Sequence, residues 1–293
     1  MIEFASLSTF GLHDSSIDTN VFVTNVVGLT GIPTIRGVTI PRPEEDGDVE
    51  PANQYLSSRT SVWDIAVFGA TMALAEATWQ QLNYFLLQAV RQPKTLRWRM
   101  VGSSLNLEAS VRVASVTPPT FTSQSSGPWY LGQVTFRHAD PNNYDQVATT
   151  QITAAPSVNV TGITWPVTWP VPWALIPSGA GTISVINSGN SWAWPVIDIT
   201  GSITNPIVQN STTGQALYFD GLALVDGQTL SIGMNPANRY ATIAGVSQFA
   251  SLRFSASEFF PISPSATEQI SFTGQGTDVN TTMTVTLQSA YIT

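Results

Sequence analysis

One long helical pattern stands alone in a chain that otherwise reads as short strands. In Thr71–Arg91 (TMALAEATWQQLNYFLLQAVR), apolar residues recur every three or four positions, from Met72 to Ala89 and widened by Phe85 and Val90. This spacing predicts one broad apolar face of an α-helix. Thr71 is a suitable N-cap, and Gln92-Pro93 ends the pattern. A single amphipathic helix among antiparallel strands favours an α+β fold for the first part of the chain.

The residues before this helix predict a long hairpin. Asn20–Gly28 and Ile32–Ile40 are rich in β-branched residues and read as strands. Ser58–Gly69 alternates, so that Trp63, Ile65 and Val67 share one face of a strand. Between these runs, Pro41–Asn53 is polar, acidic and contains three prolines. We therefore expect a projecting hairpin arm with a solvated acidic tip.

Composition shifts divide the chain into three parts. Residues 1–148 carry the helix, the arm and further strands, and we expect an antiparallel β-sandwich with one helix. Residues 149–181 contain TGITWPVTWPVPW, where the prolines exclude a helix, and we interpret them as a linker. Residues 182–293 show short alternating runs separated by turn residues, which predicts an all-β sandwich.

Charge and cysteine content exclude several classes of function. The chain has 293 residues, of which only 10% are charged, against about 25% in an average protein. Its net charge of −8 is the wrong sign for a protein that binds nucleic acid by counterion release. Without cysteine there is no zinc–thiolate site. Such sparse charge suits a subunit that buries much of its surface in permanent contacts.

No motif for catalysis, a metal or a cofactor is present in the sequence. His13-Asp14-Ser15 are adjacent, whereas a catalytic triad is assembled across a fold, and we expect structural roles for His13 and His138. The acidic cluster around Asp46 lacks the spacing of an EF-hand loop. The sequence has no phosphate-binding glycine loop, no signal peptide and no apolar run long enough to span a bilayer. We therefore expect that this chain is not an enzyme, binds no cofactor or metal, and does not insert into a membrane.

Three tryptophans in the expected linker admit two interpretations. Trp165, Trp169 and Trp173 lie four residues apart, with prolines between them. Their rings are of the kind that stacks on sugars, so they are candidates for a glycan-binding platform. Alternatively, they pack the linker against the second domain or against a neighbouring subunit. The sequence leaves both interpretations open.

Several segments, in their order along the chain, resemble one known family. In the first domain these are Ile35-Arg36-Gly37 with Arg42–Gly47, Arg59–Gly69 before the helix, and Val134–Tyr144 with its Phe…Ala-Asp-Pro…Tyr ending. The second domain adds four further segments in the usual order, namely Ile197–Gly201, Asn205–Ile207, Leu230–Ile232 and Val285…Tyr291. The chain thus resembles the siphophage distal tail proteins, a family of minor tail components. The arm is more acidic than the family pattern.

The resemblance implies a structural role in a virion. Such proteins form a hexameric ring at the distal end of a long non-contractile tail, and the ring joins the tail tube protein to tail-tip or baseplate hub proteins. DNA only passes through the lumen of the ring. The implied second domain is a galectin-like or carbohydrate-binding-like sandwich. The resemblance also implies that the protein is assembled into tails in the bacterial host cytoplasm and is located in the virion. The alternative function is a carbohydrate-binding module that attaches the tail to a host surface glycan.

The arm is the expected interface between copies. Its exposed strand edges can pair with a neighbouring subunit. We predict interface contacts from hairpin and tip residues, which are Arg36, Arg42, Arg59, Trp63, Asp46 and Asp48. A ring requires a heterologous interface, so the surface that receives the arm lies elsewhere on the same chain.

Overall fold

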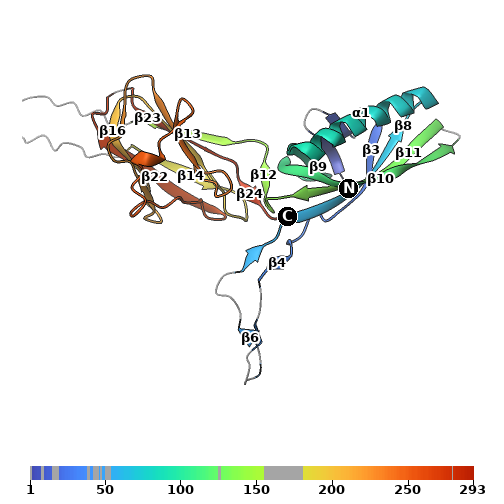
Figure 1. Ribbon diagram of the computed structural model, residues 1–293, viewed down its shortest axis with the longest axis horizontal. Coiled ribbons are helices and arrows are strands. Elements are labelled where there is room, and N and C mark those ends of the chain that lie inside the picture. The colour runs from blue at the N-terminus through green and yellow to red at the C-terminus, as the bar shows by residue number, and fades with distance from the viewer. Residues whose placement is uncertain are drawn as a thin grey trace, which may run out of the picture. The chain divides into compact units, whose positions relative to one another are not determined.

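The protein consists of two compact units (Figure 1). Our computed structural model describes residues 2–7, 10–14, 20–37, 40–41, 46, 48–49, 54–124, 127–154, 181–278 and 280–293. Unit 1 comprises Met1–Val147 and Tyr291–Thr293, and unit 2 comprises Ala148–Ala290. The expected division differs in two places. Thr149–Ala154, which we assigned to the linker, form a strand of unit 2, and the last three residues belong to unit 1.

Unit 1 is an antiparallel β-structure with one α-helix among its described residues. Its strands are β1 (Ile2–Leu7), β2 (Phe10–Asp14), β3 (Val21–Val27), β4 (Ile35–Arg36), β5 (Ile40–Pro41), β6 (Asp48–Val49), β7 (Tyr55–Leu56), β8 (Arg59–Phe68), β9 (Lys94–Met100), β10 (Leu107–Gln124), β11 (Gly127–His138) and β12 (Asn143–Asp145). The main sheet has the order β2-β1-β9-β10-β11-β8-β3, and β12 pairs with β10 and with β24 (Ala290–Tyr291).

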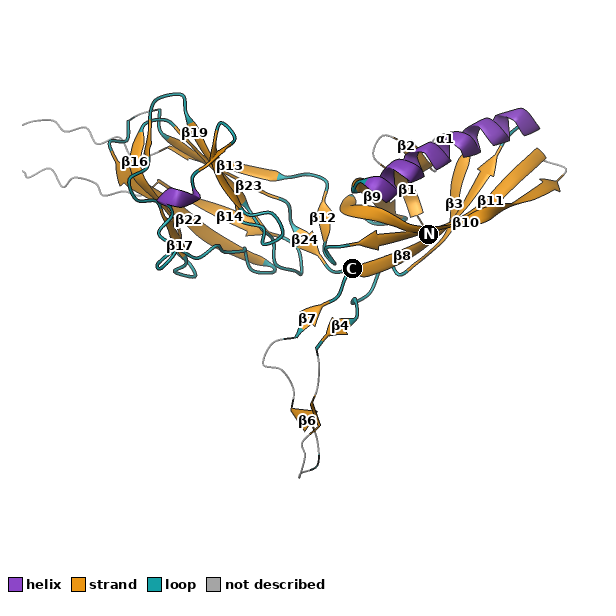
Figure 2. Cartoon of the chain, in the orientation of Figure 1, coloured by secondary structure: helices purple, strands orange, loops and turns teal. Residues whose placement is uncertain are grey.

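The helix α1 (Met72–Arg91) confirms the predicted helix almost to the residue. The Thr71 hydroxyl accepts a hydrogen bond from the Leu74 amide and caps the N-terminus, and Gln92 ends the helix. Figure 2 shows α1 lying across one face of the sheet. Gly132 of β11 allows this close approach, because a Cβ atom there would lie 2.6 Å from the Trp79 ring.

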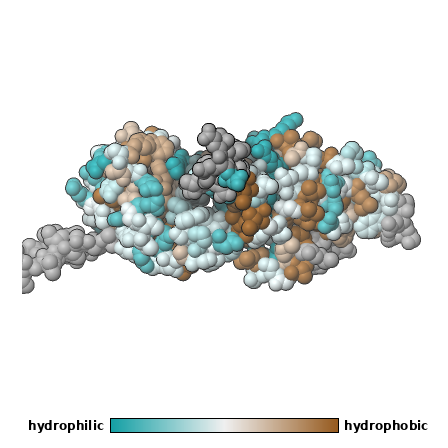
Figure 3. All heavy atoms as spheres, turned by 90° about the horizontal axis from the view of Figure 1, so that it is seen from below, coloured by the Kyte–Doolittle hydropathy of each residue, from teal (hydrophilic) through white to brown (hydrophobic). Residues whose placement is uncertain are grey.

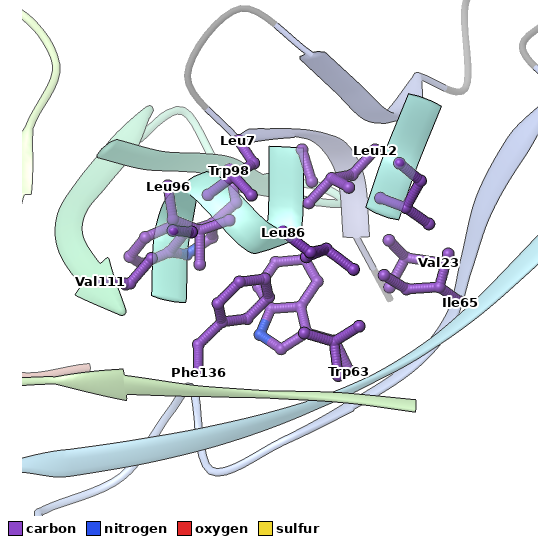
Figure 4. Packing of buried hydrophobic residues seen from close by; sticks show 14 of the residues in the cluster. Leu7, Leu12, Val23, Trp63, Ile65, Leu86, Leu96, Trp98, Val111 and Phe136 are labelled. Carbon is purple, nitrogen blue, oxygen red and sulfur yellow. The ribbon is translucent and has the colours of Figure 1, made fainter. Parts of the chain in front are cut away.

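A single apolar core fills the space between α1 and the strands of unit 1. Trp63 and Phe136 come from neighbouring strands and pack edge to face, with ring centroids 6.0 Å apart. Leu86 of α1 lies over these two rings, and Trp98 of β9 belongs to the same buried cluster (Figure 4). The alternation in β8 therefore predicts correctly which residues share a face, because Trp63, Ile65 and Val67 are all buried.

Unit 2 is the all-β sandwich that the sequence predicts. Its strands are β13 (Thr149–Ala154), β14 (Gly181–Asn187), β15 (Val196–Thr200), β16 (Ile203–Asn210), β17 (Ala216–Tyr218), β18 (Ala223–Leu224), β19 (Thr229–Gly233), β20 (Tyr240–Ile243), β21 (Val246–Ser247), β22 (Ala266–Gln275) and β23 (Thr282–Leu287), with a short 3-10 helix η1 (Phe249–Ser251). One sheet has the order β13-β23-β15-β19-β20-β21. The other has the order β14-β22-β16-β17, with β18 also paired to β16.

None of the helices in the described part of the chain combines the length and apolar character of a membrane span.

Candidate assembly surface

The arm (residues 28–58) is the connection between β3 and β8. These two strands pair antiparallel, with Val27 opposite Val62, so the arm is the extended end of a hairpin, as predicted. Instead of the continuous strand expected over Ile32–Ile40, two short ladders form, β4 with β7 and β5 with β6. In Figure 2, β4 and β7 run away from the main sheet. Strands this short have few backbone hydrogen bonds of their own.

Apolar side chains of the arm are exposed on the chain itself. Ile32 is 77% exposed, Ile35 59% and Tyr55 60%. Burying a side chain of this size stabilises a complex by about 1.5–3 kcal/mol. Ile35 and Tyr55 belong to a two-stranded ladder that is too narrow to enclose a core, and Ile32 lies just before it. Such residues are the expected contacts of an arm that packs against another protein.

The predicted interface residues lie in different environments. Arg36 is exposed in β4, and Asp46 is exposed as well. The backbone of Asp48 belongs to β6. Arg42 lies outside the described residues, as do Trp165, Trp169 and Trp173. Within the described chain, the structure thus leaves Arg36 and Asp46 accessible to a partner.

Two of the predicted interface residues require correction. Arg59 and Trp63 are both buried inside unit 1. Trp63 occupies the core face of β8 and donates a hydrogen bond from Nε1 to Ser61 Oγ at 3.0 Å. Neither side chain is accessible to a second copy. The physical reason is the alternation of β8, which places residues 59, 61 and 63 on the face covered by the core.

Arg59 instead fastens the base of the arm. Its guanidinium donates hydrogen bonds to the carbonyl oxygens of Leu29, of Gly31 at 3.0 Å and of Thr293 at 3.1 Å. Leu29 itself is buried in the core. Burial lowers the pKa of Arg59 from its ordinary value, because the charged form is desolvated. Arg59 therefore joins the start of the arm to the strand that ends it.

The segment Asp140–Tyr144, part of the family resemblance, is a tightly bonded turn after β11. The Asp140 carboxylate accepts hydrogen bonds from the Tyr144 hydroxyl at 2.6 Å and from the Asn142 amide at 3.0 Å. Burial raises the pKa of Tyr144, with a further contribution from the Asp140 charge. Asn143 is buried beside Tyr144 and donates from Nδ2 to Thr293 Oγ1 at 2.9 Å. This turn thus holds the last residue of the described chain close to Arg59.

The outward side of α1 is a second apolar surface. The sequence pattern assigns Met72 and Val90 to the buried face, whereas the structure leaves both exposed, together with Leu74, Tyr84 and Leu87. The charged residues of the helix are Glu76 and Arg91. An ordinary surface helix carries charged residues over most of its outer face. The breadth of the apolar pattern in this helix is the signal that would have revealed this surface.

The sheet face opposite α1 is partly apolar. Its acid at the centre of β8, Asp64, is held by hydrogen bonds. Figure 3 looks onto this side and shows hydrophobic residues of unit 1 at the surface. Trp129 contacts Phe22 and Phe68, with ring centroids 6.0 and 4.9 Å away. Asp64 accepts hydrogen bonds from Asn25 and Gln133 at 3.1 and 2.8 Å. Sequence reasoning missed this surface, because alternation does not show which of two apolar faces stays uncovered.

Charged residues nearer the other edge of the sheet form ion pairs. The guanidinium of Arg97 bonds to Glu108 at 3.0 Å, and that of Arg99 bonds to Glu3 at 2.9 Å. These pairs are partly exposed and contribute little to stability. They do reduce the net charge that this surface presents to a partner.

Comparison with solved structures identifies the fold. The chain is similar to the Dit protein of phage SPP1, described as a paradigm of the hub adsorption apparatus in phages that infect Gram-positive bacteria, with a TM-score of 0.66 and 14% identity over 97% of both chains. It is also similar to chains of the phage P2 baseplate in its activated conformation. The match in the Ca form has a TM-score of 0.53 and 12% identity over 98% of both chains. The match in the Sr form has a TM-score of 0.53 and 11% identity over 97% of both.

No family model matches the sequence, and no curated protein does either. The structural similarity nevertheless extends over both units, as the resemblance of the sequence segments implies. The chain therefore has the fold of the SPP1 distal tail protein along nearly its whole length.

Proposed function

We propose that this chain is a structural subunit at the distal end of a siphophage tail, where six copies form a ring between the tail tube protein and the tail-tip or baseplate hub proteins. The observation that carries the proposal is the fold similarity to SPP1 Dit over 97% of both chains. DNA passes through the lumen of this ring. The proposal assigns the chain no catalytic activity and places it in the virion, after assembly in the host cytoplasm.

The arm provides the contact between copies in this proposal. Its exposed residues Ile32, Ile35 and Tyr55 are apolar, and they pack onto a neighbouring subunit. In a cyclic ring the receiving surface differs from the arm. The outward side of α1 is sparsely charged, and the charges of Arg97, Arg99, Glu3 and Glu108 on the sheet are held in ion pairs, so either surface suits this role.

Native mass spectrometry and negative-stain imaging of the full-length protein test the proposal. We expect hexameric rings. A triple variant, Ile32→Ser with Ile35→Ser and Tyr55→Ser, should lose the rings while keeping its circular dichroism spectrum. The matched control is Val246→Ser, because Val246 is 65% exposed on a short strand of unit 2. A monomer at all concentrations, alone and mixed with tail tube protein, would contradict the proposal.

Host adhesion is the second candidate function, and a cluster of aromatic residues at the surface of unit 2 favours it. Phe249 contacts Phe254 and Phe259, with ring centroids 6.3 and 6.4 Å away. The Arg239 guanidinium lies 4.9 Å from the Phe259 ring centroid. Phe254 is exposed, and Phe249 and Phe259 are half-buried. Accessible rings beside a cation form a surface on which a sugar can stack. Binding of the full-length protein to host cell-wall polysaccharide tests this function, and loss of binding in Phe254→Ser would locate it.

A further inference from the structure

Three buried polar atoms in unit 1 have no hydrogen-bond partner within the described protein. They are Nε of Arg59, Nδ1 of His138 and Oδ1 of Asn143. The three residues are themselves buried. Each leaves one polar group unpaired while its other groups are bonded, His138 to Ser61 and Asn143 to Thr293. A buried polar group without a partner costs about 1–3 kcal/mol, so native proteins satisfy nearly all of them.

The three residues belong to one small region. Arg59 and His138 lie directly opposite each other in the β8–β11 ladder. Both side chains point to the core face, where opposite residues have Cβ atoms about 5 Å apart. Asn143 lies five residues after His138, within the Asp140–Tyr144 turn. Arg59 and Asn143 both contact Thr293, at its carbonyl oxygen and its hydroxyl.

The unpaired atoms form a complementary set. Arg59 Nε is a donor, Asn143 Oδ1 is an acceptor, and His138 Nδ1 is either, depending on the tautomer. A metal cation does not suit a site that the Arg59 charge faces. An anion does not suit a site that an amide oxygen faces. Water donates and accepts, and a buried water usually makes about three hydrogen bonds.

We propose that one buried water molecule binds Arg59 Nε, His138 Nδ1 and Asn143 Oδ1 and completes a polar junction at the base of the arm. The water accepts from Arg59, donates to Asn143 and pairs with His138 in either of its tautomers. Through Arg59 the junction holds the carbonyl groups of Leu29 and Gly31. Through Asn143 it holds Thr293. The first residues of the arm are thereby fixed to the sheet without any second copy, whether or not the chain forms a ring.

A crystal structure of the full-length protein, at a resolution that shows ordered water, tests the proposal directly. We expect a density peak within hydrogen-bond distance of all three atoms, with the electron count of water. Direct pairing of Arg59 Nε with Asn143 Oδ1 would overturn the proposal. So would a chloride ion at the position, or a region with no peak at all.

A double-mutant cycle tests the same site in solution. His138→Gln keeps an amide where Nε2 bonds Ser61 but removes the Nδ1 group, and Asn143→Leu removes Oδ1. No direct hydrogen bond joins the two side chains, so coupling between them runs through a shared partner or through the Arg59–Thr293 contacts, and the crystal structure separates these two routes. We expect the double variant to differ by about fivefold or more, in the folding equilibrium constant, from the product of the single effects. Additive effects would overturn the proposal. The control pair is His138→Gln with Glu258→Gln, which we expect to be additive.

Discussion

Ser61 and His138 form a hydrogen bond of 2.9 Å between Oγ and Nε2 inside the core of unit 1, and both side chains are fully buried. Trp63 Nε1 donates to the same Oγ at 3.0 Å. Burial, and in smaller part the charge of Arg59, lowers the pKa of His138 from 6.5 to about 4. The imidazole is therefore neutral in the folded protein at pH 7.

This depressed pKa predicts that stability falls as the pH is lowered from 6.5 to 4. In this window the unfolded chain binds a proton at His138 and the folded chain does not, so protonation favours unfolding. The loss attributable to His138 amounts to about 3 kcal/mol at pH 4. Urea unfolding at pH 7 and pH 4 measures it. His138→Gln provides the reference, because it cannot titrate, and an identical pH dependence in both proteins would contradict the assignment.

Gly28, where the arm leaves β3, allows no side chain. Its φ of +77° lies in the left-handed region, and a Cβ atom there would lie 2.4 Å from the carbonyl oxygen of Thr60. Gly28→Ala should therefore lower the free energy of unfolding by about 2–4 kcal/mol. Gly102→Ala is the matched control, because Gly102 has a φ of +79° but nothing within 4 Å of a Cβ atom. Its cost should be about 1 kcal/mol. Chemical denaturation of both variants checks the difference, and equal losses would show that the contact with Thr60 is unimportant.

Replacement of Arg59 should loosen the base of the arm. Arg59→Met keeps most of the buried volume but leaves the carbonyl groups of Leu29, Gly31 and Thr293 without their donor. We expect a loss of about 3 kcal/mol in the free energy of unfolding. We also expect faster hydrogen exchange of the Ser57 amide, which bonds the Thr34 carbonyl across the arm at 2.8 Å. Arg36→Met is the control, since Arg36 is exposed and its removal should change stability by less than about 0.5 kcal/mol. Unchanged exchange at Ser57 in Arg59→Met would contradict this role.

Local patterns in the sequence were sufficient to predict where helices and strands form. They were not sufficient to predict which face of a strand lies against the core. The helix was predictable because Thr71, Gln92 and the apolar spacing all act within the helix itself. The shared face of Trp63, Ile65 and Val67 followed from the two-residue period of a strand. Which face of β8 lies against the core is decided by segments distant in sequence. For this reason Trp63 was wrongly placed at an interface.

Arg59 could not be placed from the sequence for a related reason. An arginine at the start of a strand is usually solvated, and its burial here depends on three carbonyl groups brought together from residues 29, 31 and 293. Similarly, β13 was assigned to the linker, because it is an edge strand whose pairing partner, β23, lies far along the chain. The tryptophans of the expected linker remain a prediction.

A buried carboxylate in unit 2 leads to a further prediction. Glu268 of β22 is almost fully buried, and it accepts hydrogen bonds from Asn210 Nδ2 and from the Ser263 amide. In Glu268→Gln, one oxygen becomes an NH₂ group that faces a donor. Asn210 cannot turn to compensate without loss, because its Oδ1 already accepts from the amides of Thr212 and Thr213 at 3.1 and 3.3 Å.

Glu268→Gln should therefore lower the free energy of unfolding by about 1–3 kcal/mol and speed hydrogen exchange in β16 and β22. Glu258→Gln is the matched control, because Glu258 is exposed and its bond to Gln215 at 2.8 Å lies at the surface. That variant should change stability by less than about 0.5 kcal/mol. Hydrogen exchange also separates the two units, since amides of α1 in unit 1 should exchange at the same rate in both variants. Equal effects of the two substitutions would mean that the Glu268 carboxylate contributes no more than a surface hydrogen bond.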